Sequence, residues 1–166
     1  MQTEVDHGAI KTGQLLTVIW LIAAYITGRW ELMAALTVVF ALTSISARIG
    51  PLVLLYRFVL LPLRLARQDL RVDNPQPHQF GQAIGAVVAA IATYLLYSGQ
   101  TNIGWGLVWL LIVLTAISFF GWCAGCFTYY LLNRIGLKGF FKQAPTDPEV
   151  FMGNRPKVRA QPPSAE

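Results

Sequence analysis

The chain has 166 residues, of which 55% are hydrophobic and 13% are charged, and its formal net charge is +5. Soluble domains carry about 25% charged residues, so this composition excludes an ordinary soluble protein and favours a membrane protein. The apolar runs are continuous rather than alternating, which also excludes a membrane β-barrel.

Uncharged apolar stretches predict four transmembrane helices. The first two are short and are separated by Arg29-Trp30-Glu31, whose side chains can reach the membrane interface. No Lys, Arg, Asp or Glu occurs between Asn74 and Asn133, which is enough for two more passes because one pass needs about 20 apolar residues. The predicted spans cover about residues 12–28, 31–48, 80–98 and 103–126. We therefore predict an all-α fold, a polytopic membrane protein with four transmembrane helices.

The basic residues fix the orientation of these spans. An arrangement with the N-terminus inside places twelve of the 13 Lys and Arg residues on the cytoplasmic side, and only Arg29 falls outside. Cytoplasmic loops of membrane proteins are enriched in Lys and Arg. We therefore expect a multi-pass protein of the inner (plasma) membrane with both termini in the cytoplasm.

A segment between the second and third spans, about residues 51–70, is apolar but contains regularly spaced arginines. It is typical of an amphipathic helix that lies in the cytoplasmic interface, with Pro62 kinking or dividing it. The residues that would contact membrane lipids or an acidic partner are Arg57, Arg64, Arg67 and Arg71. The simpler interpretation, which we favour, is a basic loop that only sets the topology.

The chain is predicted to form one four-helix membrane domain over residues 1–142. Residues 143–166 are rich in proline and small polar residues, which predicts a largely disordered cytoplasmic tail.

Small residues at four-residue spacing mark the faces on which the last two spans would pack. They are Gly81, Gly85 and Ala89 in the third span, and Gly121 and Gly125 in the fourth. A tight antiparallel hairpin would bring His78 to the depth of the cysteine pair. We interpret His78 as an exposed interfacial side chain rather than as a ligand.

Cys123 and Cys126 are the only cysteines, and residues three apart share one face of a helix. Thiol redox or sulfur transfer is one interpretation, and two small residues at a helix contact is the other. With only His7 and His78 to add to two thiols, no metal site and no cofactor are predicted. Because the pair is expected near the end of a long helix, activation by a helix N-terminus is absent unless Gly121 breaks the helix and restarts it.

The chain resembles a family of small bacterial four-helix membrane proteins that is catalogued as a domain of unknown function. The motif that carries the resemblance best is the aromatic-Cys-x-Gly-Cys sequence at Trp122–Cys126, followed by Tyr129. Looser landmarks are Thr27, Gly28, Trp30, Tyr56, Arg57, Phe58, Pro62, Pro77, Phe80 and Gly85. The resemblance implies thiol or sulfur handling at the cytoplasmic face, with a thioredoxin-like or rhodanese-like protein as the partner. It implies no particular reaction.

Two functions remain in competition. The first is thiol-redox or sulfur handling at the cytoplasmic membrane face through Cys123 and Cys126 as catalytic residues. The second is a structural or accessory subunit of a larger membrane complex, with other membrane subunits as partners. Membrane lipids are expected around the protein in both cases, and nucleic acid in neither. A transporter is the weakest interpretation, because no charged residue lies within a span to couple an ion.

Overall fold

The computed structural model describes residues 3–46, 50–73, 75–135 and 152–154. Within these residues the fold is all-α, with six α-helices joined by one short π-helix and one two-stranded ribbon. In chain order the elements are β1 (Thr3–Asp6), α1 (His7–Thr27), α2 (Trp30–Ile45), α3 (Pro51–Leu55), η1 (Tyr56–Leu60), β2 (Leu70–Asp73), α4 (Pro75–Tyr97), α5 (Thr101–Phe119) and α6 (Ala124–Arg134).

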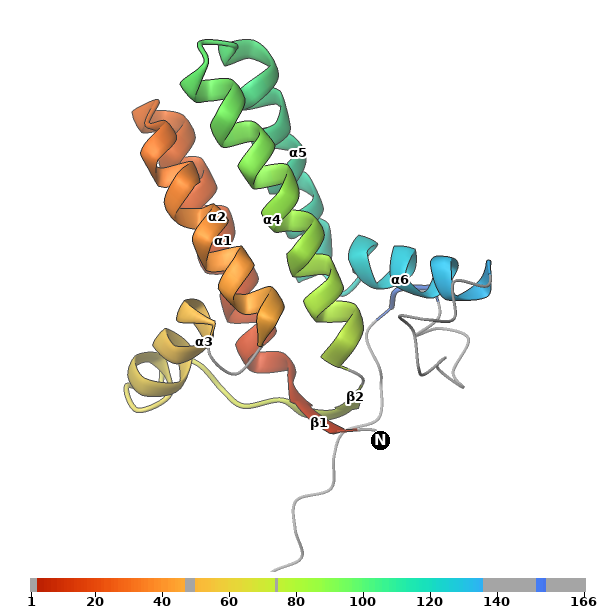
Figure 1. Ribbon diagram of the computed structural model, residues 1–166. Coiled ribbons are helices and arrows are strands. Elements are labelled where there is room, and N and C mark those ends of the chain that lie inside the picture. Colours follow the sequence, from red (N-terminus) through yellow and green to blue (C-terminus); the bar gives the residue numbers. More distant parts are fainter. Residues whose placement is uncertain (1–2, 47–49, 74, 136–151, 155–166) are drawn as a thin grey trace, which may run out of the picture.

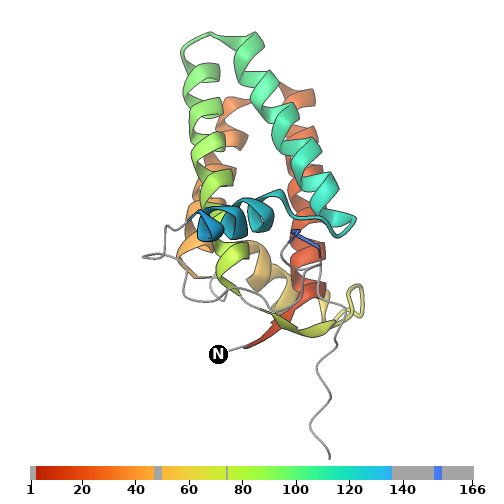
Figure 2. The same cartoon turned by 90° about the vertical axis from the view of Figure 1, so that its right-hand side faces the viewer.

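Four helices, α1, α2, α4 and α5, run side by side as a bundle (Figures 1 and 2). α4 packs against α2 and α5, and α1 packs against the same two helices, so the four close a ring around a common core. That core contains both small and large apolar residues. Its fully buried members include Leu21, Met33, Leu36, Ala89, Ala92 and Val108.

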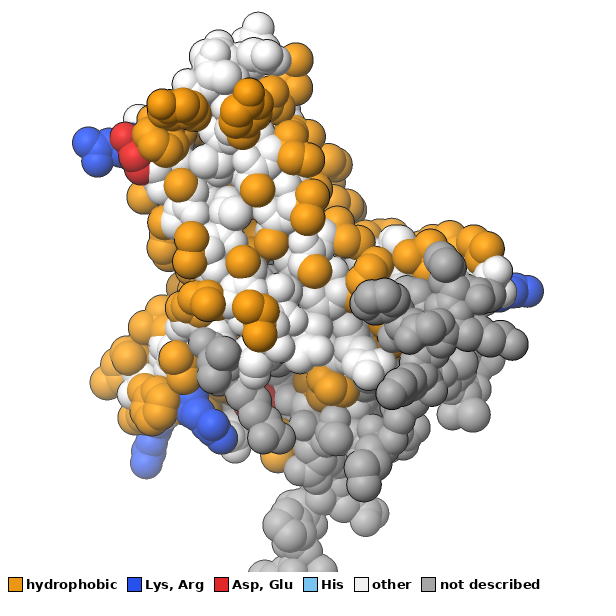
Figure 3. Space-filling model, in the orientation of Figure 1, with side chains coloured by type: hydrophobic (Ala, Val, Ile, Leu, Met, Phe, Trp, Pro, Cys, Tyr) orange, Lys and Arg blue, Asp and Glu red, His pale blue; other side chains and the backbone are white. Residues whose placement is uncertain are grey.

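Large hydrophobic side chains also cover the outer surface of the bundle. Exposed large hydrophobic residues occur on all four helices, and Figure 3 shows hydrophobic side chains spread along the bundle. Continuous apolar surface of this kind marks contact with lipid or with another protein. Three helices, α1, α4 and α5, are long and apolar enough to cross a membrane, and they overlap three of the four predicted spans. This indicates a multi-pass membrane protein. α2 has only 16 residues and is shorter than the other three.

The fourth predicted span is longer than the helix that the structure forms there. α5 ends at Phe119, Gly121 adopts a left-handed φ of 113°, and a new helix, α6, begins at Ala124. α6 lies across the lower end of the bundle rather than along it (Figures 1 and 2). The expectation that the cysteine pair lies near the end of a long helix is therefore wrong. Glycine adopts this φ without the steric cost that a side chain brings, which is why the break occurs at this position.

The lower end of the bundle is held by contacts between distant parts of the chain. β1 pairs with β2 in an antiparallel register that places Thr3 opposite Asp73 and Asp6 opposite Leu70. The Asp6 side chain caps the N-terminus of α1 by accepting from the amides of Gly8 and Ala9, and it also accepts the amide of Asp69. The ribbon thus joins the start of α1 to the chain that enters α4.

The segment predicted as an interfacial helix over residues 51–70 is helical only in its first half. Pro51 opens α3, and η1 ends at Leu60, shortly before Pro62, which cannot donate a backbone hydrogen bond to continue the helix. Of the four predicted contact arginines, Arg57, Arg64 and Arg67 are exposed. Arg71 is half-buried and forms an ion pair with Asp69 at 2.9 Å. In Figure 3, Lys and Arg side chains lie below the hydrophobic surface of this segment.

The predicted tail, residues 143–166, lies outside the described residues except for Met152–Asn154. These three residues contact the loop before α6. The Cys123 amide donates to the Gly153 carbonyl at 2.9 Å, and the Trp122 indole donates to the Met152 carbonyl at 2.9 Å.

Candidate functional site

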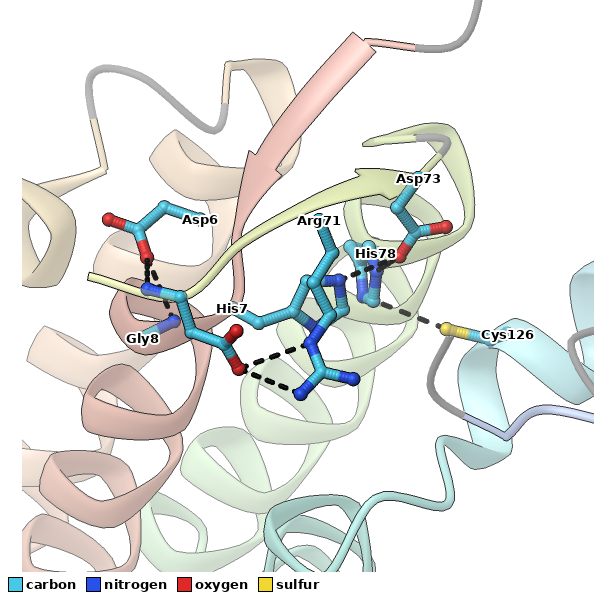
Figure 4. Close-up of polar contacts among 8 residues, drawn as sticks. Asp6, His7, Gly8, Arg71, Asp73, His78 and Cys126 are labelled. Atoms are coloured by element: carbon cyan, nitrogen blue, oxygen red, sulfur yellow. Dashed lines mark hydrogen bonds and ion pairs between the residues drawn. The ribbon is translucent and has the colours of Figure 1, made fainter. Parts of the chain in front are cut away.

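Five ionisable or sulfur-containing side chains meet where the lower end of the bundle contacts α6. Figure 4 labels His7, Asp73, His78 and Cys126 among them. The five come from four elements of the fold, α1, β2, α4 and α6. His7 is the first residue of α1, Asp73 the last residue of β2, and His78 lies in the first turn of α4. Cys123 and Cys126 occupy the N-cap and the first turn of α6. The β1–β2 pairing and the break at Gly121 are what bring them together.

Asp73 is the centre of the polar part of this site. One of its carboxylate oxygens, Oδ2, lies 3.0 Å from Nε2 of His7 and 3.0 Å from Nε2 of His78. His7 is 1% exposed and Asp73 is 8% exposed, so their hydrogen bond is shielded from water. A carboxylate only accepts hydrogen bonds, so each imidazole presents an Nε2–H to it. The two rings lie edge to face with centroids 5.7 Å apart.

His78 links this carboxylate to the cysteines. Its Nε2 faces Asp73, and its other ring nitrogen, Nδ1, lies 3.7 Å from Sγ of Cys126. The expectation that His78 lies at the depth of the cysteine pair is therefore met. It is not the exposed interfacial side chain that we favoured, because its side chain is only 23% exposed.

Cys123 occupies the N-cap of α6. Its backbone is extended, and its sulfur accepts the amide hydrogen of Cys126 at 3.3 Å. The N-terminus of a helix carries a partial positive charge that stabilises a thiolate at this position. The sequence allowed this activation only if Gly121 broke the helix and a new helix began after it. The structure contains this break and this new helix.

The two sulfurs are electrostatically unequal. The pKa of Cys123 is lowered well below its usual value, first by a hydrogen bond from the Cys126 thiol and then by His78, against the opposing effect of burial. The same hydrogen bond raises the pKa of Cys126, and burial and the nearby negative charges of Cys123 and Asp73 raise it further. Cys123 is half-buried, whereas Cys126 is 6% exposed. The pair therefore contains one reachable thiolate and one protected thiol.

A small cavity of about 20 Å³ lies beside these groups. Its lining combines the five site residues with residues of α1, α5 and α6, namely Ile10, Gln14, Ser118 and Tyr130, and with Gly121, Gly153 and Asn154 outside the helices. A cavity of this size holds about one water molecule. Two overlapping sets of side chains here have their ligand atoms within 4.8 Å of one another and could hold a metal ion. One is His78, Cys123 and Cys126, and the other is His7, Asp73 and His78.

The small residues that were predicted to pack the last two spans contact different parts of the molecule. Gly81 of α4 and Gly125 of α6 approach so closely that a Cβ added to Gly125 would lie 2.6 Å from the Gly81 Cα. Gly85 faces the ring of Phe40 in α2, and Ala89 lies in the bundle core. A Cβ added to Gly121 would meet nothing within 4 Å among the described residues, so the importance of this glycine lies in its φ.

Two members of the site, His7 and Asp73, were not expected from the sequence. They lie 66 residues apart and meet only because β1 pairs with β2. A signal for them does exist. Asp73 precedes a proline that starts a long uncharged helix, His78 follows five residues later, and His7 directly follows the Asp6 cap of another such helix. Short strands next to such caps are too weak a pattern to show that they pair.

A family model described as Domain of unknown function (DUF4395) matches residues 5–134. The chain belongs to the DUF4395 family. The DUF4395 match contains every residue of the site, from His7 to Cys126, together with all six α-helices. No curated protein and no solved structure shows a significant similarity to the chain.

Proposed function

We propose that this DUF4395 protein is a four-pass protein of the bacterial inner membrane that performs thiol–disulfide exchange at the cytoplasmic face. The observation that carries the proposal is the position of Cys123, at the N-cap of α6 with its sulfur accepting the Cys126 amide. This position supplies what the sequence alone lacked, a reason for one sulfur to be a thiolate at neutral pH.

The packing of α2 supports a four-pass topology. α2 follows α1 after only Gly28 and Arg29, and it packs along α4, which is itself long enough to cross a membrane. Sixteen helical residues are about 24 Å long, somewhat less than the roughly 30 Å of a bilayer core. Flanking side chains that reach to the interface and local thinning of the bilayer accommodate a difference of this size.

The distribution of charge supports a cytoplasmic site. The start of α1 and the chain from η1 to β2 lie at the end of the bundle near α6 (Figure 1), and they contain Lys11, Arg57, Arg64, Arg67 and Arg71. The opposite end carries Arg29, next to Glu31. A positive surface at the membrane face attracts soluble acidic partners as well as anionic lipid.

The exchange would proceed in two balanced steps. The Cys123 thiolate attacks a disulfide of a soluble protein, a mixed disulfide forms, and one partner sulfur leaves as a thiolate. Cys126 then loses its proton to water, with His78 Nδ1 at 3.7 Å placed to stabilise the thiolate that forms, and attacks the Cys123 sulfur. The second partner thiolate leaves, the Cys pair is oxidised to a disulfide, and the partner is reduced to a dithiol. The reverse sequence, with a dithiol partner, restores the reduced pair.

The same thiolate would serve sulfur transfer. Attack of Cys123 on the outer sulfur of a carrier persulfide breaks the carrier S–S bond and releases the carrier thiolate. Cys123 then holds a persulfide. Both versions need one reachable thiolate, and they differ in the partner and in whether Cys126 takes part.

Reduced, metal-free, full-length protein in detergent tests the proposal with a soluble aromatic disulfide whose released thiolate is coloured. We expect the wild type to release two thiolates per reagent molecule and to end with a Cys123–Cys126 disulfide. Cys126→Ser should stop at a mixed disulfide on Cys123, visible by mass spectrometry. Cys123→Ser should react at least about 100-fold more slowly, because Cys126 is a buried thiol rather than a thiolate. Equal rates for the two single variants would contradict the proposal.

Thiol trapping in rapidly quenched cells tests the cellular role. A pair whose redox state changes with oxidant or sulfur supply supports exchange. A pair that stays fully reduced under all these conditions, together with recovery of the chain in fixed stoichiometry with other membrane proteins, would favour the accessory-subunit function instead. An impermeant thiol reagent that labels the pair from outside intact cells would overturn the cytoplasmic assignment.

A further inference from the structure

We propose that, in the reduced protein, Cys123 Sγ, Cys126 Sγ and His78 Nδ1 bind a single thiophilic divalent cation, for which Zn²⁺ is the probe. This metal site goes beyond the proposed function but uses the same two sulfurs. It departs from the expectation drawn from the sequence, which counted ligands without knowing that His78 lies beside the cysteines.

The three ligand atoms lie close enough together for one tetrahedral ion to reach all of them. All three lie within 4.8 Å of one another, and the Cys126 sulfur is 3.7 Å from His78 Nδ1. A thiolate at about 2.3 Å and an imidazole at about 2.0 Å from a tetrahedral zinc ion are themselves roughly 3.5 Å apart. An ion therefore fits between these atoms with only small movements of the side chains.

Asp73 orients His78 for coordination. Its Oδ2 accepts from Nε2 of His78, so Nδ1 is the ring nitrogen on the side of the sulfurs, and an ion that binds there displaces the Nδ1 proton. Metal-binding histidines usually donate their second ring N–H to a carboxylate in this way, which fixes the tautomer and the ring orientation. Asp73 is buried and is itself fixed by His7, so this support is built into the fold.

The cavity offers the fourth position of the site. Its volume of about 20 Å³ has room for one water molecule beside the ion. Gln14 lines the same cavity, and its Oε1 is buried without a hydrogen-bond partner among the described residues. A metal-bound water would give this oxygen a donor. Two thiolates, one imidazole and water match the zinc sites that keep one position open.

Metal binding and thiol exchange exclude each other. Two sulfurs joined in a disulfide lose the thiolate charges that hold the ion, so oxidation by a disulfide partner releases the ion. Conversely, the ion displaces the Cys126 proton and occupies the thiolate that would attack a disulfide. The bound ion would thus protect the two thiols from disulfide exchange, and oxidation of the pair would release the ion.

Titration of the reduced, full-length protein in detergent with Co²⁺, followed by competition with Zn²⁺, tests the site. We expect one ion per chain, thiolate-to-cobalt charge-transfer absorption, tetrahedral d–d bands, and loss of all three after oxidation to the disulfide. Cys123→Ser and Cys126→Ser should each abolish the charge-transfer signal of a two-thiolate site. His78→Gln and Asp73→Asn should weaken binding at least about tenfold. Glu31→Gln, an exposed acidic residue at the opposite end of the bundle, should bind like the wild type.

Binding without charge-transfer absorption, or binding that survives either serine substitution unchanged, would show only adventitious ions and overturn the proposal. If Asp73→Asn does not fold, judged by helical circular dichroism and gel filtration, His78→Gln alone decides the nitrogen ligand. The two proposals fail separately. A pair that cycles with a disulfide but binds no ion overturns the metal site alone, and a pair that binds the ion but never exchanges overturns the thiol function alone.

Discussion

The bundle and its lower end are built in different ways. The bundle helices α1, α2, α4 and α5 contain long uncharged stretches, and their polar side chains mostly hydrogen-bond to a carbonyl one turn back in the same helix, as Thr37, Thr43 and Thr93 do. The lower end depends instead on hydrogen bonds between residues 48 to 66 positions apart, such as His7 with Asp73 and Cys126 with His78. The bundle is held by its apolar core while its polar side chains bond locally, whereas the lower end depends on a few buried polar contacts between distant residues.

This difference predicts where a single polar substitution matters most. Asp73→Asn removes the charge that both histidines share while keeping the shape of the side chain. We expect a loss of about 3 kcal/mol in the free energy of unfolding, because the substitution breaks a buried, charge-assisted pair. Denaturation of the full-length protein in detergent measures it, with Glu31→Gln as the control that should change stability by no more than about 0.5 kcal/mol. If the two substitutions lowered the free energy of unfolding equally, the proposed difference between the two regions would be wrong.

The junction between the two regions is the contact of α4 with α6. A methyl group on Gly125 would meet the Gly81 Cα at 2.6 Å, so Gly125→Ala must push α6 away from the bundle. We expect a loss of about 2 kcal/mol, typical of overpacking, together with faster alkylation of Cys126 as its cover loosens. Gly106→Ala in α5 is the matched control, because nothing lies within 4 Å of its added Cβ, and it should be neutral or slightly stabilising. A Gly125→Ala protein as stable as Gly106→Ala would show that α4 and α6 can move apart to accept the methyl group without loss of stability.

The sequence predicted these two regions with unequal success for a physical reason. Apolar length and the absence of charge place α1, α4 and α5 directly, because lipid requires a helix wherever such a run occurs. The end of α5 was misplaced because residues 120–126 are as uncharged as the span before them, and only the φ of Gly121 separates the helices. The site was half found. The cysteines and the depth of His78 followed from counting, but Asp73 and His7 depend on a four-residue ribbon whose pairing no local pattern specifies.

The pH dependence of Cys123 provides a smaller and more local test. The pKa of Cys123 is lowered, so its thiolate should persist as the pH falls through the usual range of a thiol and be lost only at a much lower pH. In reduced, metal-free protein we expect its alkylation rate, followed by mass spectrometry, to change less than about threefold from pH 8 to pH 6. An ordinary thiol, as in the denatured chain, should slow about 70-fold over the same interval. A folded protein that follows the denatured curve would remove the electrostatic basis of the proposed exchange.

The smallest effect is expected inside the bundle, where Thr37 of α2 and Thr93 of α4 face each other with their hydroxyl oxygens 3.4 Å apart. Each hydroxyl also hydrogen-bonds to its own helix, Thr37 to the Met33 carbonyl and Thr93 to the Ala89 carbonyl. Loss of the contact between the helices therefore leaves neither group without a partner. A double-mutant cycle of Thr37→Val and Thr93→Val should give a coupling of about 0.6 kcal/mol, the average for hydrogen bonds between membrane helices. A coupling above about 2 kcal/mol would mean that the bundle, like the lower end, depends on a specific polar contact. The two regions would then be stabilised in the same way.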